Sequence, residues 1–591
     1  MVAERSGNRV TSAKAYVNSA VVLSGDRGKG AGSIASVLDL ALAATKMLSD
    51  SQDKVRLLME IAKLNQDNFE RFDRSVLQGR AMAVHDMVSE ALNISVQLGD
   101  LQGESYALGG MGRLYEIAGR YRDALHYTRR ALFVAQQTQD SGILFRMLWQ
   151  AGRIHRALGD VGKSIDLYRQ SIFNLQSIRH GMRRHQVDAD ASFRREVRAV
   201  YYEFSELLLS ILVSTRGEEA RQSILVEVRD TIENFKAAEL RNYFQDDCVD
   251  SYRDRENMSN YTAPDTAIVY PLIFENKLNI VISFYDQFRQ YEVEVESARL
   301  AGEVVRFRRM LEKPSRGGYV ERSRHLYEWL FRPYEKDLIE KGVETVVFVP
   351  DGALRLLPLG ALHDGRQYLV ERFVFAKSPG LTLTDSQSMD RDDISIMSAG
   401  LTKSVQGFPS LPFVANELDS IGALYRTMRV QDEEFLVENV DKELARRSYP
   451  IVHIATHGWF KPDAQDSFLL TYDGKMTMSH LARFIERSRY GDEPIELLTL
   501  SACQTAAGDD QAALGLAGLS VRSGARSALA TLWLINDEAS SILMAEFYTQ
   551  LKDSNISKAK ALQRAQIKLL SSRRYQHPGY WSAFLMIGNW L

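Results

Sequence analysis

A histidine and a cysteine stand near the ends of two apolar runs in the C-terminal half of this 591-residue chain. The run IVHIATHGWF (451–460) carries His457, and the run LLTLSACQTAAG (497–508) carries Cys503, 46 positions later (503 − 457). A cysteine becomes a nucleophile when a base takes its proton, and acyl transfer at the sulfur also needs amide donors for an oxyanion. His457 and Cys503 are therefore a candidate dyad. The amides of Gly458 and Cys503 are the natural oxyanion donors, because glycine lets a substrate carbonyl approach the backbone.

Other interpretations of these residues compete with the dyad. A free cysteine is often a buried core residue, and Cys503 taken alone fits that description. His453 and His457 invite a zinc site with Cys503, but four residues of a strand span about 13 Å and the chain has no HExxH helix. We therefore expect no metal and no cofactor, and we assign His453 to sheet packing or to orienting the loop. Cys248 has no histidine or basic helix start nearby and is expected to be inert.

The elements that position the dyad are predicted from apolar runs that alternate with helical segments. Residues 266–295 alternate in polarity and predict a pair of strands with a turn at 275–277. Further strands are expected at 344–352, 394–400, 450–458, 495–503, 527–533 and 582–588. Short strands separated by helices predict a mainly parallel sheet that is covered by helices on both faces. Sites in such sheets form at the carboxyl ends of strands, which is where His457 and Cys503 stand.

The first 250 residues predict one helix after another, and part of this region repeats. The segments that align are SEALNISVQLGD (89–100), RRALFVAQQTQD (129–140) and RQSIFNLQSIRH (169–180). Their spacing is 40 residues (131 − 91 and 171 − 131), and Gly119 aligns with Gly159 at an expected turn. Stacked helix–turn–helix units give this pattern, which resembles tetratricopeptide repeats with a period longer than the usual 34. An unrelated helical bundle is the alternative. The pattern favours a solenoid.

Composition excludes several classes of protein. The net charge of −3 gives no general attraction to nucleic acid or to an anionic membrane. Two cysteines cannot form a disulfide framework, so a reducing cytosol is the natural compartment. The N-terminus MVAERSGNRV has no apolar core of a secretory signal, and no run of 18 uncharged apolar residues exists. We expect a soluble cytoplasmic protein with no membrane contact.

Two further motifs were weighed as binding sites. The glycine-rich stretch 23–33 lacks the Ser or Thr that a phosphate-binding loop needs after Lys29, so a flexible segment is the better interpretation. The stretch RHGMRRHQ (179–186) forms a basic cluster with Arg194, Arg195 and Arg198. It is interpreted as a solvated face, with docking of an acidic or nucleic-acid partner as the alternative. No recognised nucleic-acid-binding motif supports the latter.

The last 330 residues resemble a CHAT domain, the caspase-like domain that is found with tetratricopeptide repeats. The matching pieces are VFVPDGALRLLPLGALHDGRQYLVERFVFAKSPGLTLT, VHIATHG, LLTLSACQTAAGD, GLAGLSVRSGARSALATLWLINDEAS and HPGYWSAFLMIGNW, in that order. This domain belongs to the clan of caspases, separase, gingipain and clostripain. The resemblance implies that His457 and Cys503 are the catalytic dyad of a cysteine endopeptidase.

The resemblance also implies a substrate pocket. The stretch WLIND (533–537) resembles the separase-type segment whose final aspartate meets a substrate arginine, so Asp537 would bind Arg or Lys at P1 through a charge-assisted hydrogen bond. Asp509 and Asp510 add negative charge after the nucleophile. A helix N-cap is the compatible alternative for Asp537. The stretches 408–418 and 512–515 depart from the family pattern, and both bear on the details of this pocket.

The expected architecture is multidomain: an all-α tetratricopeptide-like solenoid followed by an α/β caspase-like domain. Residues 1–33 are expected to be a flexible segment, 34–257 the helical domain and 258–591 the peptidase domain. The last divides into a regulatory half (258–390) and a catalytic half (391–591). A helix at 223–244 is expected to close the solenoid and join it to the next domain.

Partners follow from the resemblance as well. The solenoid is expected to dock a protein regulator or substrate on its concave surface and to keep the peptidase silent until it is triggered. Some bacterial relatives sit beside antiviral systems, with RNA-guided effector complexes or with gasdermin pore-formers that cleavage releases. Two alternatives remain: a catalytically silent scaffold that only binds proteins, and another acyl transfer at the same dyad, such as transpeptidation.

Overall fold

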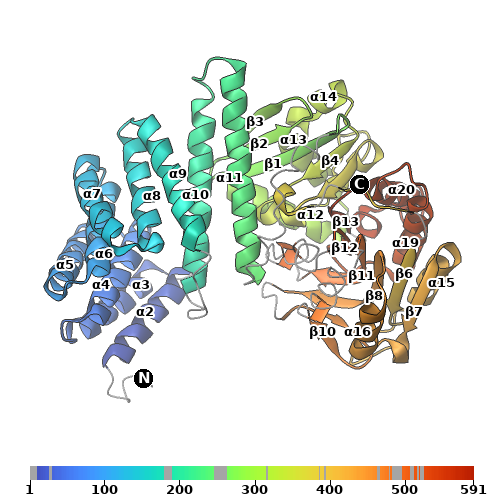
Figure 1. Cartoon of the computed structure of the whole chain (residues 1–591), viewed down its shortest axis with the longest axis horizontal. Coiled ribbons are helices and arrows are strands. Elements are labelled where there is room, and N and C mark those ends of the chain that lie inside the picture. Colours follow the sequence, from blue (N-terminus) through green and yellow to red (C-terminus); the bar gives the residue numbers. More distant parts are fainter. Residues whose placement is uncertain are drawn as a thin grey trace. The chain divides into compact units, whose positions relative to one another are not determined.

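The computed structural model describes residues 9–25, 30–178, 189–244, 263–314, 317–384, 387–391, 394–461, 466–477, 480–481, 495–505, 512–514, 518 and 525–591. For residues 189–193 and 502–505 it describes the backbone alone. The chain forms two compact units, Met1–Leu207 and Leu208–Leu591. Figure 1 shows the helices of the first unit and the sheet of the second.

The first unit is helical throughout its described residues. Its helices are α2 (Arg9–Gly25), α3 (Ala31–Lys46), α4 (Gln52–Asp67), α5 (Arg74–Leu98), α6 (Leu101–Ile117), α7 (Tyr121–Thr138), α8 (Ser141–Ala157), α9 (Val161–Ile178) and α10 (Ala189–Ile211), the last of which crosses the division between the units. The 40-residue repeat corresponds to the hairpins α6–α7 and α8–α9. Gly119 (φ 71°) and Gly159 (φ 83°) hold the same left-handed position in the two turns, which glycine adopts without strain. The predicted helical repeats are confirmed.

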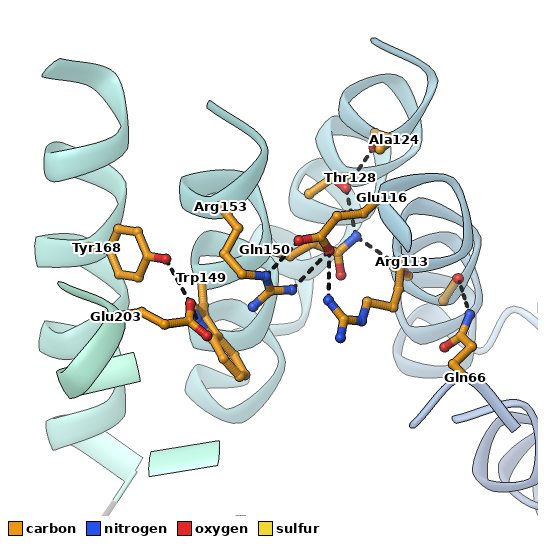
Figure 2. A network of polar contacts seen from close by, with 12 residues as sticks. Gln66, Arg113, Glu116, Ala124, Thr128, Trp149, Gln150, Arg153, Tyr168 and Glu203 are labelled. Carbon is orange, nitrogen blue, oxygen red and sulfur yellow. Dashed lines mark hydrogen bonds and ion pairs between the residues drawn. The ribbon is translucent and has the colours of Figure 1, made fainter. Parts of the chain in front are cut away.

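Polar side chains tie successive repeats together on one side of the helices, as Figure 2 shows. Arg153 on α8 donates from Nε and Nη2 to the carboxylate of Glu116 on α6, at 2.7 and 3.0 Å. The indole Nε1–H of Trp149 and the hydroxyl of Tyr168 both donate to Glu203 on α10, at 2.7 and 2.8 Å. These bonds satisfy polar groups that the packing of the helices partly removes from water.

The N-terminal segment differs from its prediction. Residues 1–33 were expected to be flexible, but α2 occupies Arg9–Gly25. Ala13, Val17 and Ala20 are buried in the core of the first unit. Their spacing of three and four residues places them on one helix face, and small side chains allow that face to approach its neighbours closely. Lys29 lies outside the described residues.

Helix α11 (Glu218–Phe244) belongs to the second unit. The sequence led us to place residues 223–244 at the end of the solenoid, with the domain boundary at 257–258. The compact units instead divide between Leu207 and Leu208. The boundary expected from the sequence falls within residues 245–262, which are outside the described part of the chain.

The second unit is built on one mixed sheet. Its strands are β1 (Thr266–Ile273), β2 (Lys277–Ser283), β3 (Phe288–Glu294), β4 (Thr345–Phe348), β5 (Val374–Lys377), β6 (Ser395–Gly400), β7 (Arg426–Gln431), β8 (Ile451–Phe460), β9 (Phe468–Leu470), β10 (Lys475–Thr477), β11 (Leu497–Thr505), β12 (Ser527–Thr531) and β13 (Phe584–Gly588). The strand order is β10-β9-β8-β11-β12-β13-β5-β4-β1-β2-β3, and β6 joins it by pairing with β7 and β8.

Most pairs in the centre of this sheet are parallel, as the alternation of strands and helices predicted. Parallel pairs join β7–β6–β8–β11–β12 and β13–β5–β4–β1, while β12–β13 and the hairpins β1–β2–β3 and β8–β9–β10 are antiparallel. The flanking helices are α12 (Ser297–Leu311), α13 (Tyr319–Leu330), α14 (Arg332–Glu340), α15 (Phe413–Leu424), α16 (Val437–Arg446), α19 (Asp537–Leu551) and α20 (Lys558–Leu570), as Figure 1 shows. The predicted α/β class is confirmed. In the described ranges, no helix combines the length and the apolar character that a membrane crossing needs.

Candidate active site

The candidate dyad lies on neighbouring parallel strands. β8 and β11 run in register from Leu497 opposite Ile451 to Ser501 opposite Ala455. Continuous apolar runs suit strands that are buried on both faces, and β8 is buried along nearly its whole length. The strand ends that carry the histidine and the cysteine therefore meet at one edge of the sheet, as the sequence predicted.

An irregularity in β8 sets the register at the site. Ser501 lies opposite Ala455, but Cys503 lies opposite Gly458, so β8 advances three residues while β11 advances two. This extra residue is a β-bulge, which bends a strand and redirects the side chains beside it. The bulge falls at Thr456 and His457, and both are buried. The backbone of Cys503 is thereby placed opposite the residue that follows His457.

His457 is oriented by a backbone carbonyl. Its Nε2 lies 2.9 Å from the carbonyl oxygen of Pro409, in the loop before α15. Because a carbonyl oxygen can only accept a hydrogen bond, Nε2 carries a hydrogen, and in the neutral imidazole Nδ1 is then the nitrogen with the lone pair. The ring of Phe408 packs on the imidazole with 5.2 Å between the ring centroids. His457 is thus held in the tautomer that a general base requires.

Pro409 was missed by the sequence analysis. It lies within the stretch 408–418, which was noted only as a departure from the family pattern. The contribution comes from a main-chain oxygen, which any residue would supply, so residue type carries no signal for it. The proximity of this loop to His457 could be found only from the three-dimensional fold.

Asp537 lies beside the site and is fixed to α15. Its Oδ2 accepts the backbone N–H of Phe413, the first residue of that helix, at 2.8 Å. Burial raises the pKa of Asp537; the Phe413 N–H opposes this effect, the carboxylate of Glu417 adds to it, and His457 opposes it. The N-cap of α19 is Asn536, whose side chain accepts from Ala539 N at 3.0 Å, so the capping role considered for Asp537 belongs to its neighbour.

The remaining predicted site residues are described less completely. Asp509 and Asp510 lie outside the described residues, and only the backbone of Cys503 is described. Gly458 lies between two strands, opposite Cys503 on β11 and Leu469 on β9. The oxyanion role of the Gly458 and Cys503 amides stays a prediction.

A second histidine forms a buried polar cluster on the same strands. His453 Nε2 is 2.9 Å from Glu417 Oε1 on α15, a close polar contact that does not meet the geometry of a hydrogen bond. His453 Nδ1 lies 3.1 Å from the hydroxyl of Tyr548, and Ser501 donates to Glu417 Oε2 at 3.3 Å. His453 therefore packs against Glu417 and Tyr548 in the core. Within the described ranges, no group of three histidine, cysteine or acidic side chains could hold a metal ion.

Helix α11 packs against the segments that follow both dyad strands. The hydroxyl of Tyr243 donates to the carbonyl of Lys461, directly after β8, at 2.9 Å. A Cβ on Gly518, which follows β11 in the chain, would collide with Leu240 and Phe244. The C-terminal end of α11 thus contacts the continuation of both strands.

The middle of α11 is anchored by two buried ionisable side chains. Glu233 accepts from Leu381 N, Thr382 N and the Tyr270 hydroxyl, each at 3.0 Å. Lys236 donates to the carbonyl of Pro350 at 2.7 Å and pairs with Asp351 at 3.0 Å. Buried charges with several partners define one register, so α11 is an integral part of the second unit.

Comparison with known proteins agrees with this domain organisation. Residues 320–589 match the family model of the CHAT domain. Tetratricopeptide repeat protein 28 from Homo sapiens is 23% identical over 327 residues, which are 45% of this chain and 13% of that protein. The chain thus spans only a small part of the length of this relative.

Two solved structures match the chain at low similarity. A Saccharomyces cerevisiae separase–securin complex matches at a TM-score of 0.39 and 9% identity, over 98% of this chain and 53% of the matched chain. The Arg-specific cysteine proteinase gingipain R matches at a TM-score of 0.30 and 9% identity, over 50% of this chain and 74% of its own. These likenesses are too distant to bear on activity.

Proposed function

We propose that the protein is a cysteine endopeptidase in which Cys503 is the nucleophile and His457 is the base. The observation that carries this proposal is the hydrogen bond from His457 Nε2 to the Pro409 carbonyl at 2.9 Å. It leaves Nδ1 as a proton acceptor at the strand edge where β11 brings the backbone of Cys503. A nucleophile beside a base that a third group orients is the arrangement of covalent acyl transfer.

The reaction follows from these roles. His457 Nδ1 takes the thiol proton, and the thiolate attacks the carbonyl carbon of the scissile peptide bond. The amides of Gly458 and Cys503 donate to the oxyanion. The C–N bond then breaks as His457 returns the proton to the departing amine. Water, deprotonated by His457, hydrolyses the thioester and releases the free acid and the thiol. No metal takes part in these steps.

Cleavage after Arg or Lys is proposed from Asp537. One of its oxygens accepts the Phe413 N–H, which fixes the carboxylate at the start of α15 and within electrostatic reach of His457. A carboxylate has about four lone-pair positions, so a P1 guanidinium can bind the remaining ones. Asp509 and Asp510 would add negative charge to the same pocket.

The helical unit is proposed to dock a protein that regulates the peptidase or serves as its substrate. Stacked helical repeats present extended surfaces for such partners. A cytoplasmic location, a role in bacterial defence, and an RNA-guided effector or a gasdermin as the partner rest on composition and family resemblance alone. The competing function is a silent scaffold that only binds proteins.

Peptidyl acyloxymethyl ketones with Arg or Asp at P1 test the peptidase proposal. Each is incubated with wild type and Cys503→Ala, with and without lysate of the native host, and the labelled peptide is mapped by mass spectrometry. Cys248 is the internal control, because it is the only other cysteine in the chain. We expect the Arg probe to label Cys503 alone. Preference for Asp would overturn the pocket assignment, and no label under any condition would favour the scaffold.

A further inference from the structure

Two phenylalanines project from equivalent positions of successive repeats. Phe133 on α7 is 68% exposed and Phe173 on α9 is 70% exposed. They lie 40 positions apart (173 − 133), which is the repeat spacing. Single exposed apolar side chains are ordinary on protein surfaces. A repeated exposed phenylalanine is different, because stacked repeats place equivalent residues in a row.

A hollow lies next to the first of these phenylalanines. It has a volume of about 740 Å³ and is formed between α6 and α7. Besides Phe133, its apolar lining comes from Leu101, Leu108, Leu125 and Val134. It is an open hollow of the surface rather than an enclosed cavity. The hollow is large enough to accept an apolar side chain of a binding partner.

The polar lining of the hollow is mainly basic. Arg122, Arg129 and Arg130 are exposed and border it, with His126, whereas Glu104 is the acidic residue in its lining. Within the described part of the chain, none of these three guanidiniums has a carboxylate partner. Arg120, at the start of the same helix, is by contrast paired with Asp123 at 2.7 Å. The hollow therefore combines an apolar floor with uncompensated positive charge.

Three arginines of α8, in contrast, are each paired with a carboxylate of the chain. Arg146 pairs with Glu196 at 2.8 Å, Arg153 with Glu116 at 2.7 Å, and Arg156 with Glu206 at 3.1 Å. Figure 2 shows the middle pair. An acidic partner would have to displace these carboxylates of the chain itself, but it meets no such competition at the arginines of α7. Charge complementarity thus selects the α6–α7 hollow as the docking surface.

We propose that the α6–α7 hollow binds an acidic peptide segment of a partner protein, with an apolar side chain inserted beside Phe133. Phe173 on the next repeat provides a second apolar contact for a peptide that runs along the repeats. This inference rests on the partner docking that the proposed function assigns to the helical unit, and it specifies the chemistry of that partner. Its test measures binding, so an inactive peptidase and an absent docking surface give different results.

Fluorescein-labelled peptides of 12 residues are the probes. One pool is Asp/Glu-rich with a single Phe or Leu at varied positions, a second replaces that residue by Ser, and a third replaces the acids by Lys. Anisotropy is measured with the full-length wild type, Phe133→Ala, Arg129→Glu and the matched control Arg74→Glu, an exposed position on α5. We expect the first pool to bind, and about a tenfold loss from Phe133→Ala and from Arg129→Glu but not from Arg74→Glu.

Four results would overturn the proposal. One is the absence of binding by the first pool. If the Ser pool bound as tightly as the first pool, and Phe133→Ala did not change this binding, the surface would be basic without specificity for an apolar side chain. If oligo-dT displaced the bound peptides at a concentration below that of the peptides, the surface would be a nucleic-acid site. A dimer in light scattering that Phe133→Ala dissociates would show that a second copy of the chain covers this surface. Because Phe133 is exposed, its truncation leaves the fold intact, and an unchanged thermal melt checks this.

Discussion

The imidazole of His457 donates its Nε2 hydrogen to the carbonyl of Pro409, a residue 48 positions earlier in the chain. The same loop leads to Phe413, whose N–H is held by Asp537. In the proposed site, Asp537 would therefore act in two ways: through its charge, and through the loop that orients the base. Two substitutions of Asp537 separate these effects.

Asp537→Asn and Asp537→Ala should behave differently. The Asn side chain can still accept from Phe413 N, so the loop and His457 stay in place while the charge is lost. We expect labelling by the Arg probe to fall about tenfold or more, since a hydrogen bond to a charged group contributes about 1.5–3 kcal/mol. The reaction of Cys503 with iodoacetamide should be unchanged in Asp537→Asn and slowed in Asp537→Ala. Equal loss of both reactions in Asp537→Asn would argue against a pocket role.

The raised pKa of Asp537 predicts a pH dependence of stability. The folded state holds this proton more tightly than the unfolded chain, whose pKa is the ordinary 3.8. The resulting stabilisation is complete below pH 3.8 and is lost as the pH rises through the higher folded pKa. The difference in Tm between Asp537→Asn and wild type should therefore shift in favour of the variant between pH 4 and pH 7. Thermal melts of both proteins at the two pH values measure it, and a constant difference would contradict the prediction.

Gly518→Ala should destabilise the second unit. A Cβ at this position collides with Leu240 and Phe244 of α11, and overpacking of this kind costs about 1–3 kcal/mol. Gly474→Ala, in the same unit, is the matched control because a Cβ there meets open space. Denaturant unfolding compares the two variants. We also expect slower alkylation of Cys503 in Gly518→Ala. Equal stability of the two variants would contradict the prediction and would show that the side chains of Leu240 and Phe244 move aside at little cost.

Glu417→Leu should be among the most destabilising substitutions near the site. It removes the carboxylate beside buried His453 and the acceptor of Ser501. Removal of an acceptor that leaves a buried polar group unsatisfied costs about 1–3 kcal/mol. His453→Leu/Glu417→Leu should recover part of this loss, and unfolding measurements of His453→Leu, Glu417→Leu and the double variant give the coupling. Treatment with EDTA should leave the wild-type melt unchanged, because His453 is packed against Glu417 and Tyr548 in the core.

Glu116→Gln should weaken the helical unit more at neutral pH than in acid. Burial raises the pKa of Glu116, but Arg153 and then Arg113 outweigh it, so the pKa lies below its ordinary value of 4.5. The stabilisation by the ionised carboxylate is present above pH 4.5 and is lost as the pH falls through the lowered pKa. Circular-dichroism melts should show a larger deficit of the variant at pH 7 than at pH 3.5. Arg74→Gln, outside the network, serves as the control.

Features that depend on residue type or spacing could be predicted from the sequence. Buried apolar runs located β8 and β11, and the position of His457 and Cys503 at their ends placed both at one sheet edge. The 40-residue spacing located the hairpins α6–α7 and α8–α9. These signals survive in a single sequence because they arise from burial and from turn chemistry.

Features that depend on the backbone or on distant packing could not be predicted from the sequence. The bulge at Thr456 and His457 leaves no mark in an apolar run, and the Pro409 carbonyl is common to every residue type. Glu417 appeared as an ordinary acidic residue of a helix until α15 was seen to pack it against His453. The helix α2 was missed because its buried face is made of small residues, which give a weak periodic signal.

The burial of α11 in the second unit has a consequence for how such proteins can recombine. Exchange of the helical part between relatives at the compositional boundary near residue 258 would separate Glu233 from Leu381 and Thr382, and Phe244 from Gly518. A crossover ahead of Glu218 would keep these contacts within one parent. Viable natural or engineered chimaeras should therefore carry α11 with the sheet to which it is bonded, and the exchangeable module ends before this helix begins.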